Sequence, residues 1–141
     1  VLDESIRFPS YIDTSPFRID PAERTLRRIV PKMRREADFL ILLSHMGIAR
    51  TEDLLAGVGD FDIAVVGHGK PLIKKVMRVG ETLLIGTGGL GQYIGRMDLI
   101  LAPDGEVEYN KFRLIPLSEE IAIDIGIRDL FAAYGLSVTD K

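Results

Sequence analysis

Two apolar runs decide the fold of this 141-residue chain: ADFLILLSH at residues 37–45 and FDIAVVGH at residues 61–68. Each run is nearly continuous and of strand length, which is typical of strands buried on both faces, as in a parallel sheet. Each ends in one of the chain's two histidines, His45 and His68. Because ligands of open parallel sheets bind outside the carboxyl ends of the strands, the two imidazoles are candidate site residues.

Helical patterns flank both runs. Asp20-Pro21 predicts a helix start, with a capping side chain before a proline, and apolar residues at helical spacing continue to near residue 37. We expect Pro31 to kink or split this helix. A second, short helix is expected over residues 51–55, with Thr51 as its cap and acids in its first turn. The order helix, strand, helix, strand predicts a layered α/β fold.

The second half of the chain changes pattern. Four consecutive strands separated by turn signals predict an antiparallel meander joined to the parallel half, at residues 75–79, 82–86, 93–101 and 107–114. Asp124 is expected to cap a last helix that ends at Gly135. The alternation of isoleucines at 121, 123 and 125 favours a further strand just before that helix.

Composition and charge exclude several classes of protein. A net charge of −3 offers no footprint for nucleic acid or an anionic membrane. Lysines and arginines do gather between Arg24 and Arg35, but they alternate with apolar residues, as on a solvated helix face; the alternative is a phosphate-binding patch. The absence of cysteine excludes disulfides and thiolate metal sites, and no apolar run approaches the roughly 18 residues of a membrane span. Since the chain begins with Val1, we expect a fragment of a longer protein, whose remaining part could hold a signal sequence.

A glycine motif follows one of the expected strands. Residues 86–91, GTGGLG, match G-x-G-x-x-G, but a dinucleotide site needs these glycines to open a helix. The next residues, QYIGRMDLIL at 92–101, alternate as a strand does. We therefore expect the glycines to allow a close approach between backbones instead.

Both histidines stand beside small residues, in SHMG at 44–47 and GHGK at 67–70, which leaves the access that a metal ion needs. Imidazole suits zinc, manganese and iron. Asp60 and Asp62 begin the strand that His68 follows, so they lie about 20 Å from it at about 3.3 Å per residue. Glu52 and Asp53 are nearer, but acids in the first turn of a helix are explained by the helix dipole.

Three segments, in this order, resemble the calcineurin-like metallophosphoesterases, and most closely their bacterial 5′-nucleotidase and UDP-sugar hydrolase branch: LLSHMG at 42–47, DFDIAVVGHG at 60–69 and LIGTGGLGQYIGRMDL at 84–99. The resemblance implies a layered α/β/β/α sandwich, of which this chain is one part. Residues 1–117 would form the C-terminal half of that domain, and residues 118–141 a terminal helix or linker.

The resemblance also implies a two-metal hydrolase, in which divalent ions such as zinc, manganese or iron clamp a phosphate ester. His45 and His68 match two late ligand positions that serve the same metal. The third late position falls on Lys70, whose ammonium has no lone pair for a cation. The family's earlier Asp-x-His, bridging aspartate and Gly-Asn-His segments do not occur in this sequence, so we expect no complete catalytic set in it.

The expected function is therefore part of a phosphoesterase that acts on phosphate esters or nucleotides, inactive as the isolated chain. One alternative is a degenerate, non-catalytic binding or structural module, which Lys70 motivates. Another is an α/β domain whose histidines are only structural. The resemblance favours a periplasmic or extracellular location. A half-domain exposes an unpaired strand edge, so we also expect self-association through that edge.

Overall fold

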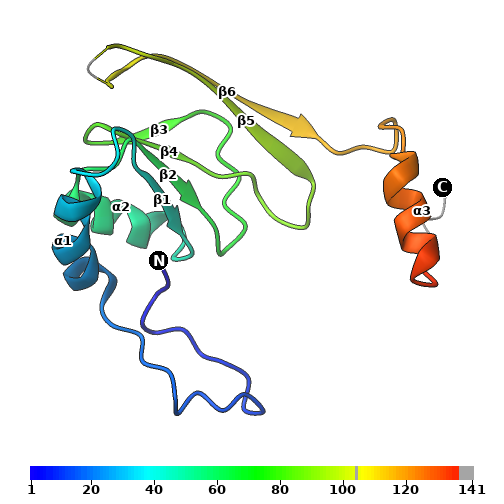
Figure 1. Ribbon diagram of the computed structural model, residues 1–141, viewed down its shortest axis with the longest axis horizontal. Coiled ribbons are helices and arrows are strands. Elements are labelled where there is room, and N and C mark those ends of the chain that lie inside the picture. Colours follow the sequence, from blue (N-terminus) through cyan, green and yellow to red (C-terminus); the bar gives the residue numbers. More distant parts are fainter. Residues whose placement is uncertain (104, 137–141) are drawn as a thin grey trace.

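A computed structural model describes residues 1–103 and 105–136, apart from the side chain of Tyr109; residues 137–141 of the expected terminal segment lie outside this range (Figure 1). The elements in chain order are α1 (Ala22–Met33), β1 (Ile41–Ser44), α2 (Ile48–Val58), β2 (Ile63–Val66), β3 (Met77–Val79), β4 (Thr82–Ile85), β5 (Tyr93–Leu101), β6 (Val107–Pro116) and α3 (Ile125–Ala133).

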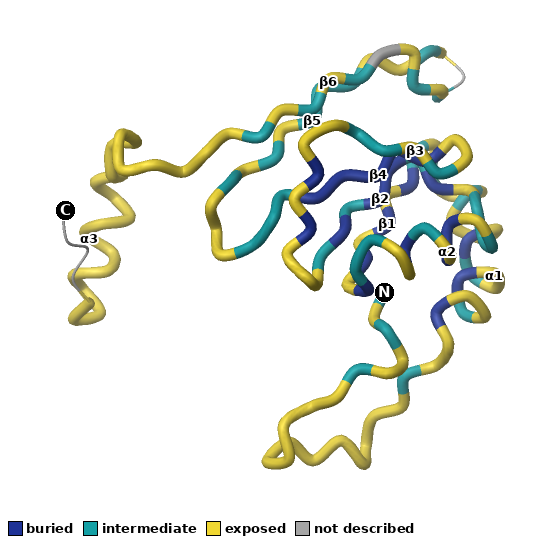
Figure 2. Tube along the Cα trace, turned by 180° about the vertical axis from the view of Figure 1, so that it is seen from behind, coloured by how far each residue is buried: buried dark blue, intermediate teal, exposed yellow. Residues whose placement is uncertain are grey.

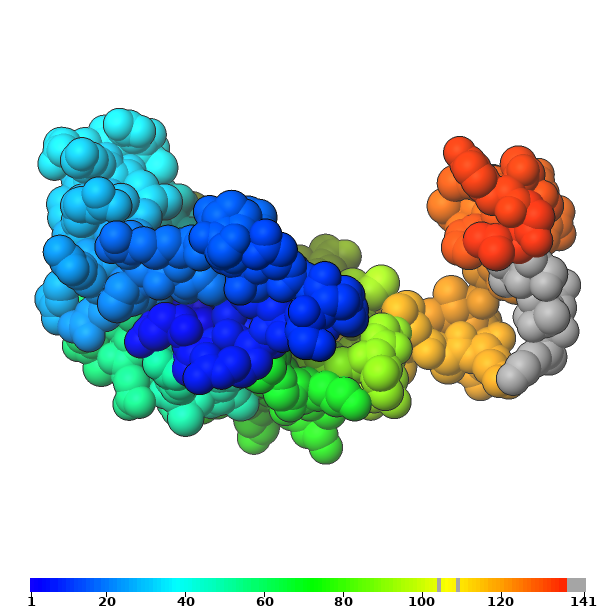
Figure 3. Space-filling view, turned by 90° about the horizontal axis from the view of Figure 1, so that it is seen from below, coloured from blue at the N-terminus to red at the C-terminus, as the bar shows by residue number. Residues whose placement is uncertain are grey.

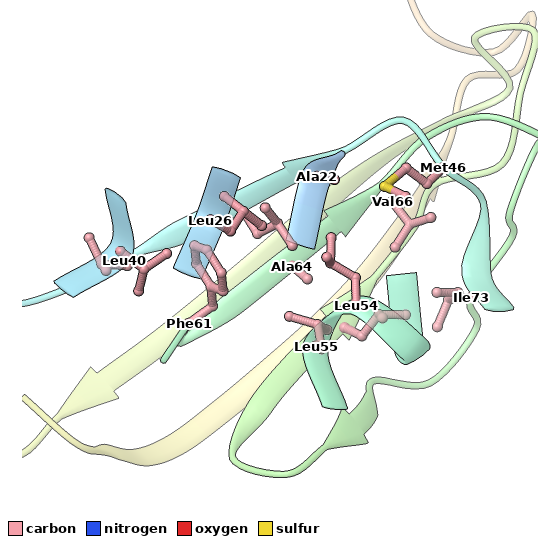
Figure 4. Close-up of a cluster of buried hydrophobic side chains, with 13 residues drawn as sticks. Ala22, Leu26, Leu40, Met46, Leu54, Leu55, Phe61, Ala64, Val66 and Ile73 are labelled. Carbon is pink, nitrogen blue, oxygen red and sulfur yellow. The ribbon is translucent and has the colours of Figure 1, made fainter. Parts of the chain in front are cut away.

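A four-stranded sheet in the order β1-β2-β4-β3 forms the centre of the fold. The strands β1, β2 and β4 run parallel, and β3 is antiparallel to β4. One face of the sheet packs against α1 and α2, where Leu42, Ala64 and Leu84 from three neighbouring strands are buried with Leu26 and Leu54 of the helices (Figure 4). The two apolar runs thus form adjacent parallel strands, as expected.

The opposite face of the sheet is partly covered by a second sheet, the β5–β6 hairpin. Ile63, Leu83 and Ile85 form a smaller cluster there, packed against side chains of the hairpin that include Met97 and Phe112. The result is a helix layer, a mixed sheet and a second sheet (Figure 1). These are three successive layers of the expected sandwich, so the predicted α/β class is confirmed.

The meander prediction is wrong in one respect. The third and fourth expected strands do pair with each other, as β5 and β6, but β4 joins the parallel sheet next to β2 instead of pairing with β5. The reason is packing: all four residues of β4 are buried. Such a strand belongs in the middle of a sheet that is covered on both faces.

The helix ends differ in part from the predictions. The first helix starts at Ala22 without a side-chain cap, because its N-cap position is Pro21; Asp20 lies one residue earlier and pairs with Arg18. Pro31 lies within the last turn and does not split the helix, which ends two residues later. Asp124 does cap α3, accepting a hydrogen bond of 3.0 Å from the backbone N–H of Ile127.

The segment after β6 stands apart from the layered body (Figures 1 and 3). Every residue from 117 to 136 is exposed, α3 included, as the yellow tube in Figure 2 shows. The isoleucines at 121, 123 and 125 do not form the expected strand. None of the helices in the described residues has the length and apolarity needed to span a bilayer.

Candidate metal centre

The parallel pairing of β1 with β2 brings the two histidines to one edge of the sheet. Ser44 is opposite Val66, so His45 follows β1 at the level of Gly67, and His68 lies one residue further. The pairing continues past the strand ends, where the N–H of Gly67 donates to the carbonyl of Ser44 at 2.6 Å. The register therefore fixes which residues meet here.

A left-handed turn makes the meeting possible. By strand alternation, His45 points to the face away from the helices, whereas position 68 would point towards them, as Val66 does. His68, Gly69 and Lys70 instead have φ values of 64°, 70° and 56°, respectively. Two of these three are not glycine, so the turn carries backbone strain at a candidate site.

The two imidazoles lie in edge-to-face contact with ring centroids 5.0 Å apart and planes at 67°. Nδ1 of His68 is 3.3 Å from Nε2 of His45, and both side chains are exposed. Two nitrogens bound to one tetrahedral zinc at about 2.0–2.1 Å stand about 3.3–3.4 Å apart. The separation therefore fits two ligands of a single ion; without an ion, the same nitrogens can share one hydrogen bond.

A buried hydroxyl network holds the turn that follows His45. Thr51 donates to the carbonyl of Gly47 at 2.6 Å, and its oxygen lies 2.7 Å from the hydroxyl of Ser44. Because the single Thr51 proton goes to Gly47, Ser44 is the donor to Thr51. Both side chains are buried, Thr51 completely, so the network ties the end of β1 to the start of α2.

This network corrects two predictions. Thr51 is not a cap, because α2 begins at Ile48 and places Thr51 in its interior with a hydrogen bond to the residue four positions earlier. Glu52 and Asp53 are consequently not in the first turn of the helix, which contains no acid.

Gly67 leaves room for the His45 ring. A Cβ added at this position would lie 3.2 Å from Nδ1 of His45, tighter than ordinary van der Waals contact. Gly67 has no positive φ, so space and not backbone conformation explains its residue type.

Lys70 takes no part in the histidine pair. Its side-chain stem lies on the glycine loop, where a Cβ at Gly89 would come within 2.5 Å of Lys70 Cγ. The glycines of this loop lead into β5 and not into a helix, so they allow close packing, as expected, and form no phosphate-binding helix start.

The Asp62 carboxylate serves the fold. Asp62 accepts a hydrogen bond of 2.6 Å from the N–H of Leu40 and pairs with Arg34 at 2.9 Å, which joins the end of α1 to the sheet. Within the described residues, no group of three or more His, Asp or Glu side chains is arranged to hold a metal. Because catalytic zinc takes about three protein ligands, the histidine pair is an incomplete set on its own.

The N-terminal segment also reaches the site, which the sequence did not predict. Leu2 pairs with His45 in a parallel bridge, and the following residues line a hollow of about 250 Å³ together with both histidines. The lining residues outside the pair are Asp3, Ser5, Ile6 and Arg7. Hydrogen bonds from the hydroxyl and backbone N–H of Ser5, together with the Arg50 guanidinium, hold the pKa of Asp3 below its ordinary value.

Comparisons with known proteins place these features in context. No protein-family model matches the chain. The uncharacterized metallophosphoesterase YunD of Bacillus subtilis is 24% identical over 92 residues, which cover 65% of this chain and 20% of that protein. The chain therefore spans about a fifth of the length of this relative.

Two solved structures share the fold. The sulfate thiohydrolase SoxB of Thermus thermophilus superimposes with a TM-score of 0.70 and 27% identity, over 84% of this chain and 22% of that one. A Staphylococcus aureus protein assigned as a 5′-nucleotidase gives a TM-score of 0.63 and 22% identity, over 84% and 26% of the two chains. Together with the histidine segments, these similarities show that the chain has the fold of part of a calcineurin-like metallophosphoesterase domain.

Proposed function

We propose that this chain forms part of a metal-dependent phosphoesterase that hydrolyses phosphate esters, 5′-nucleotides among them. His45 and His68 would bind the same divalent ion through Nε2 and Nδ1, respectively. The observation that carries the proposal is the 3.3 Å separation of these nitrogens at the ends of adjacent parallel strands.

Each neighbouring group has a part in this function. When bound, a divalent ion supplies Lewis-acid stabilisation of a phosphoryl group. The parallel register and the Ser44–Thr51 network orient His45, and the left-handed turn directs His68 towards it. Gly67 keeps the space that the His45 ring occupies.

We propose that the remaining ligands come from residues outside these 141, packed against β1. The strand β1 is at the edge of the sheet, and its Ile41 and Leu43 side chains are 52% and 67% exposed. Leu2 already runs parallel to β1, and the Val1 nitrogen donates to the Leu43 carbonyl at 2.5 Å. These features fit a further strand and apolar layer on this side. Residues 1–117 would then belong to the phosphoesterase domain and residues 118–141 to a linker.

The direct test is phosphate release from a 5′-nucleotide with added manganese. A longer protein that contains this chain should be active, and His45→Ala or His68→Ala should abolish the activity, since each removes a ligand. The 141-residue chain alone should be inactive. Activity of the isolated chain that disappears on His68→Ala would contradict the proposed division of the ligand set.

A second candidate is a non-catalytic module with the same fold. Lys70 favours it, because the side chain at this ligand position is cationic and lies against Gly89 instead of beside the histidines. A longer protein that contains complete Asp-x-His and Gly-Asn-His segments, yet releases no phosphate, would support this candidate. The likeness to SoxB adds that the fold alone does not determine the substrate.

A further inference from the structure

Among the residues that the structure describes, Arg7 is the one arginine that lines the hollow shared by the two histidines. It arrives there because Leu2 pairs with His45, which carries the next residues across the open end of β1. Arg7 thus adds a cation to a site otherwise lined by the two imidazoles, the Asp3 carboxylate, Ser5 and Ile6.

Of the two charged side chains that line the hollow, Asp3 is engaged by several partners and Arg7 by few. The Asp3 carboxylate accepts from the N–H and the hydroxyl of Ser5, at 2.7 and 2.6 Å, and forms an ion pair with Arg50. The Arg7 guanidinium donates to the Ser5 carbonyl at 3.1 Å and has no acidic partner among the residues that the structure describes. Most of its five N–H donors therefore remain available.

We propose that Arg7 binds the phosphoryl group of a ligand held at His45 and His68. This inference rests on the proposed function and extends it by naming a residue that recognises the anion. A planar guanidinium suits a phosphate group because it can donate two parallel hydrogen bonds. The hollow, at about 250 Å³, is smaller than most ligand pockets, which measure about 300–1,000 Å³. It suits a phosphate-sized group, with the rest of the ester outside.

Inorganic phosphate is the probe for this test, added to the 141-residue chain at constant pH. Since the chain has two histidines, their Cε1–H signals in a ¹H–¹³C spectrum report on the site directly. We expect both signals to shift in a saturable way. Arg7→Ala should weaken phosphate binding about tenfold to a hundredfold, as expected for loss of a charge-assisted hydrogen bond, and Arg7→Lys should weaken it less. Arg128→Ala, an exposed arginine on α3 outside the hollow, is the matched control and should change nothing.

Two results would overturn the inference: wild-type signals that do not respond to phosphate, or an Arg7→Ala variant that binds as tightly as the wild type. Zinc titration of the same samples separates this inference from the proposed function. Loss of phosphate binding in Arg7→Ala with zinc binding retained supports both. A chain that binds phosphate through Arg7 but no zinc would refute the metal centre and leave the anion site in place.

Discussion

His68 meets His45 because its backbone is left-handed, with φ 64°. This conformation costs a residue that has a Cβ about 1–2 kcal/mol. Lys70, two residues later, is also left-handed, with φ 56°. Strain concentrated beside a candidate ligand is what a site shaped for function, and not for stability, should show.

Replacing His68 therefore separates stability from binding. We expect His68→Gly to be more stable than His68→Ala by about 0.5–1 kcal/mol, since relief of the strain exceeds the entropic cost of glycine. Denaturant unfolding of the two variants measures the difference. Equal stability would mean that the turn is not strained in solution.

Gly67 gives a steric test of how His45 is positioned. Gly67→Ala should displace the His45 ring, because the added Cβ would lie 3.2 Å from Nδ1, and so weaken zinc binding. Gly57→Ala is the control, since its Cβ meets Glu23 Oε1 at the same 3.2 Å but at the end of a flexible side chain. Calorimetric zinc titrations in which the two variants bind alike would argue against this role for Gly67.

At the scale of elements, the Ser44–Thr51 network joins β1 to α2. Thr51→Val leaves the buried Ser44 hydroxyl without its acceptor and should cost about 1–3 kcal/mol of unfolding free energy. Ser44→Ala leaves the bond from Thr51 to Gly47 intact and should cost less, about 0.5–1.5 kcal/mol. Thermal and denaturant unfolding can rank the two variants, and the reverse order would show that the network does not link the elements as described.

The sequence predicted those elements whose signals are local. The two apolar runs became β1 and β2. The predicted burial on both faces holds for β2, but it is wrong for β1, whose Ile41 and Leu43 are exposed because β1 lies at the edge of the sheet. Two outcomes depended on distant contacts instead. Parallel pairing of β4 with β2 depends on burial of both its faces, and Thr51 was mistaken for a cap because its partner, Ser44, belongs to the preceding strand.

The sequence likewise predicted only those residues of the candidate site that have a local signal. His45 and His68 were found because each follows an apolar strand, and the pairing of those strands brings them together. Asp3 and Arg7 were missed because the segment before α1 has no periodic pattern. They reach the hollow only through the pairing of Leu2 with His45, which no local signal records.

At the scale of the whole molecule, the unfinished side of the sheet is the main feature. Ile41 and Leu43 lie on an edge strand and are largely exposed. Exposed apolar edge strands pair readily with other chains. In the isolated chain, we therefore propose that this edge associates with a second copy.

Light scattering across a concentration series tests that association. Wild-type chain should form dimers or larger species as its concentration rises, and Leu43→Lys should remain monomeric, because an edge lysine opposes strand pairing. Leu90→Lys, at a leucine that is 80% exposed in the glycine loop, is the control and should associate as the wild type does. A wild-type chain that is monomeric at high concentration would refute the proposal.

His45 and His68 are proposed to bind one ion together. Zinc titration of the 141-residue chain, followed by the Cε1–H signals of its two histidines, tests this most directly. We predict that both signals change over the same range of zinc concentration and saturate at one ion per chain, and that His45→Ala greatly weakens the response of His68. A response from one histidine alone, or from neither, would contradict a shared ion site.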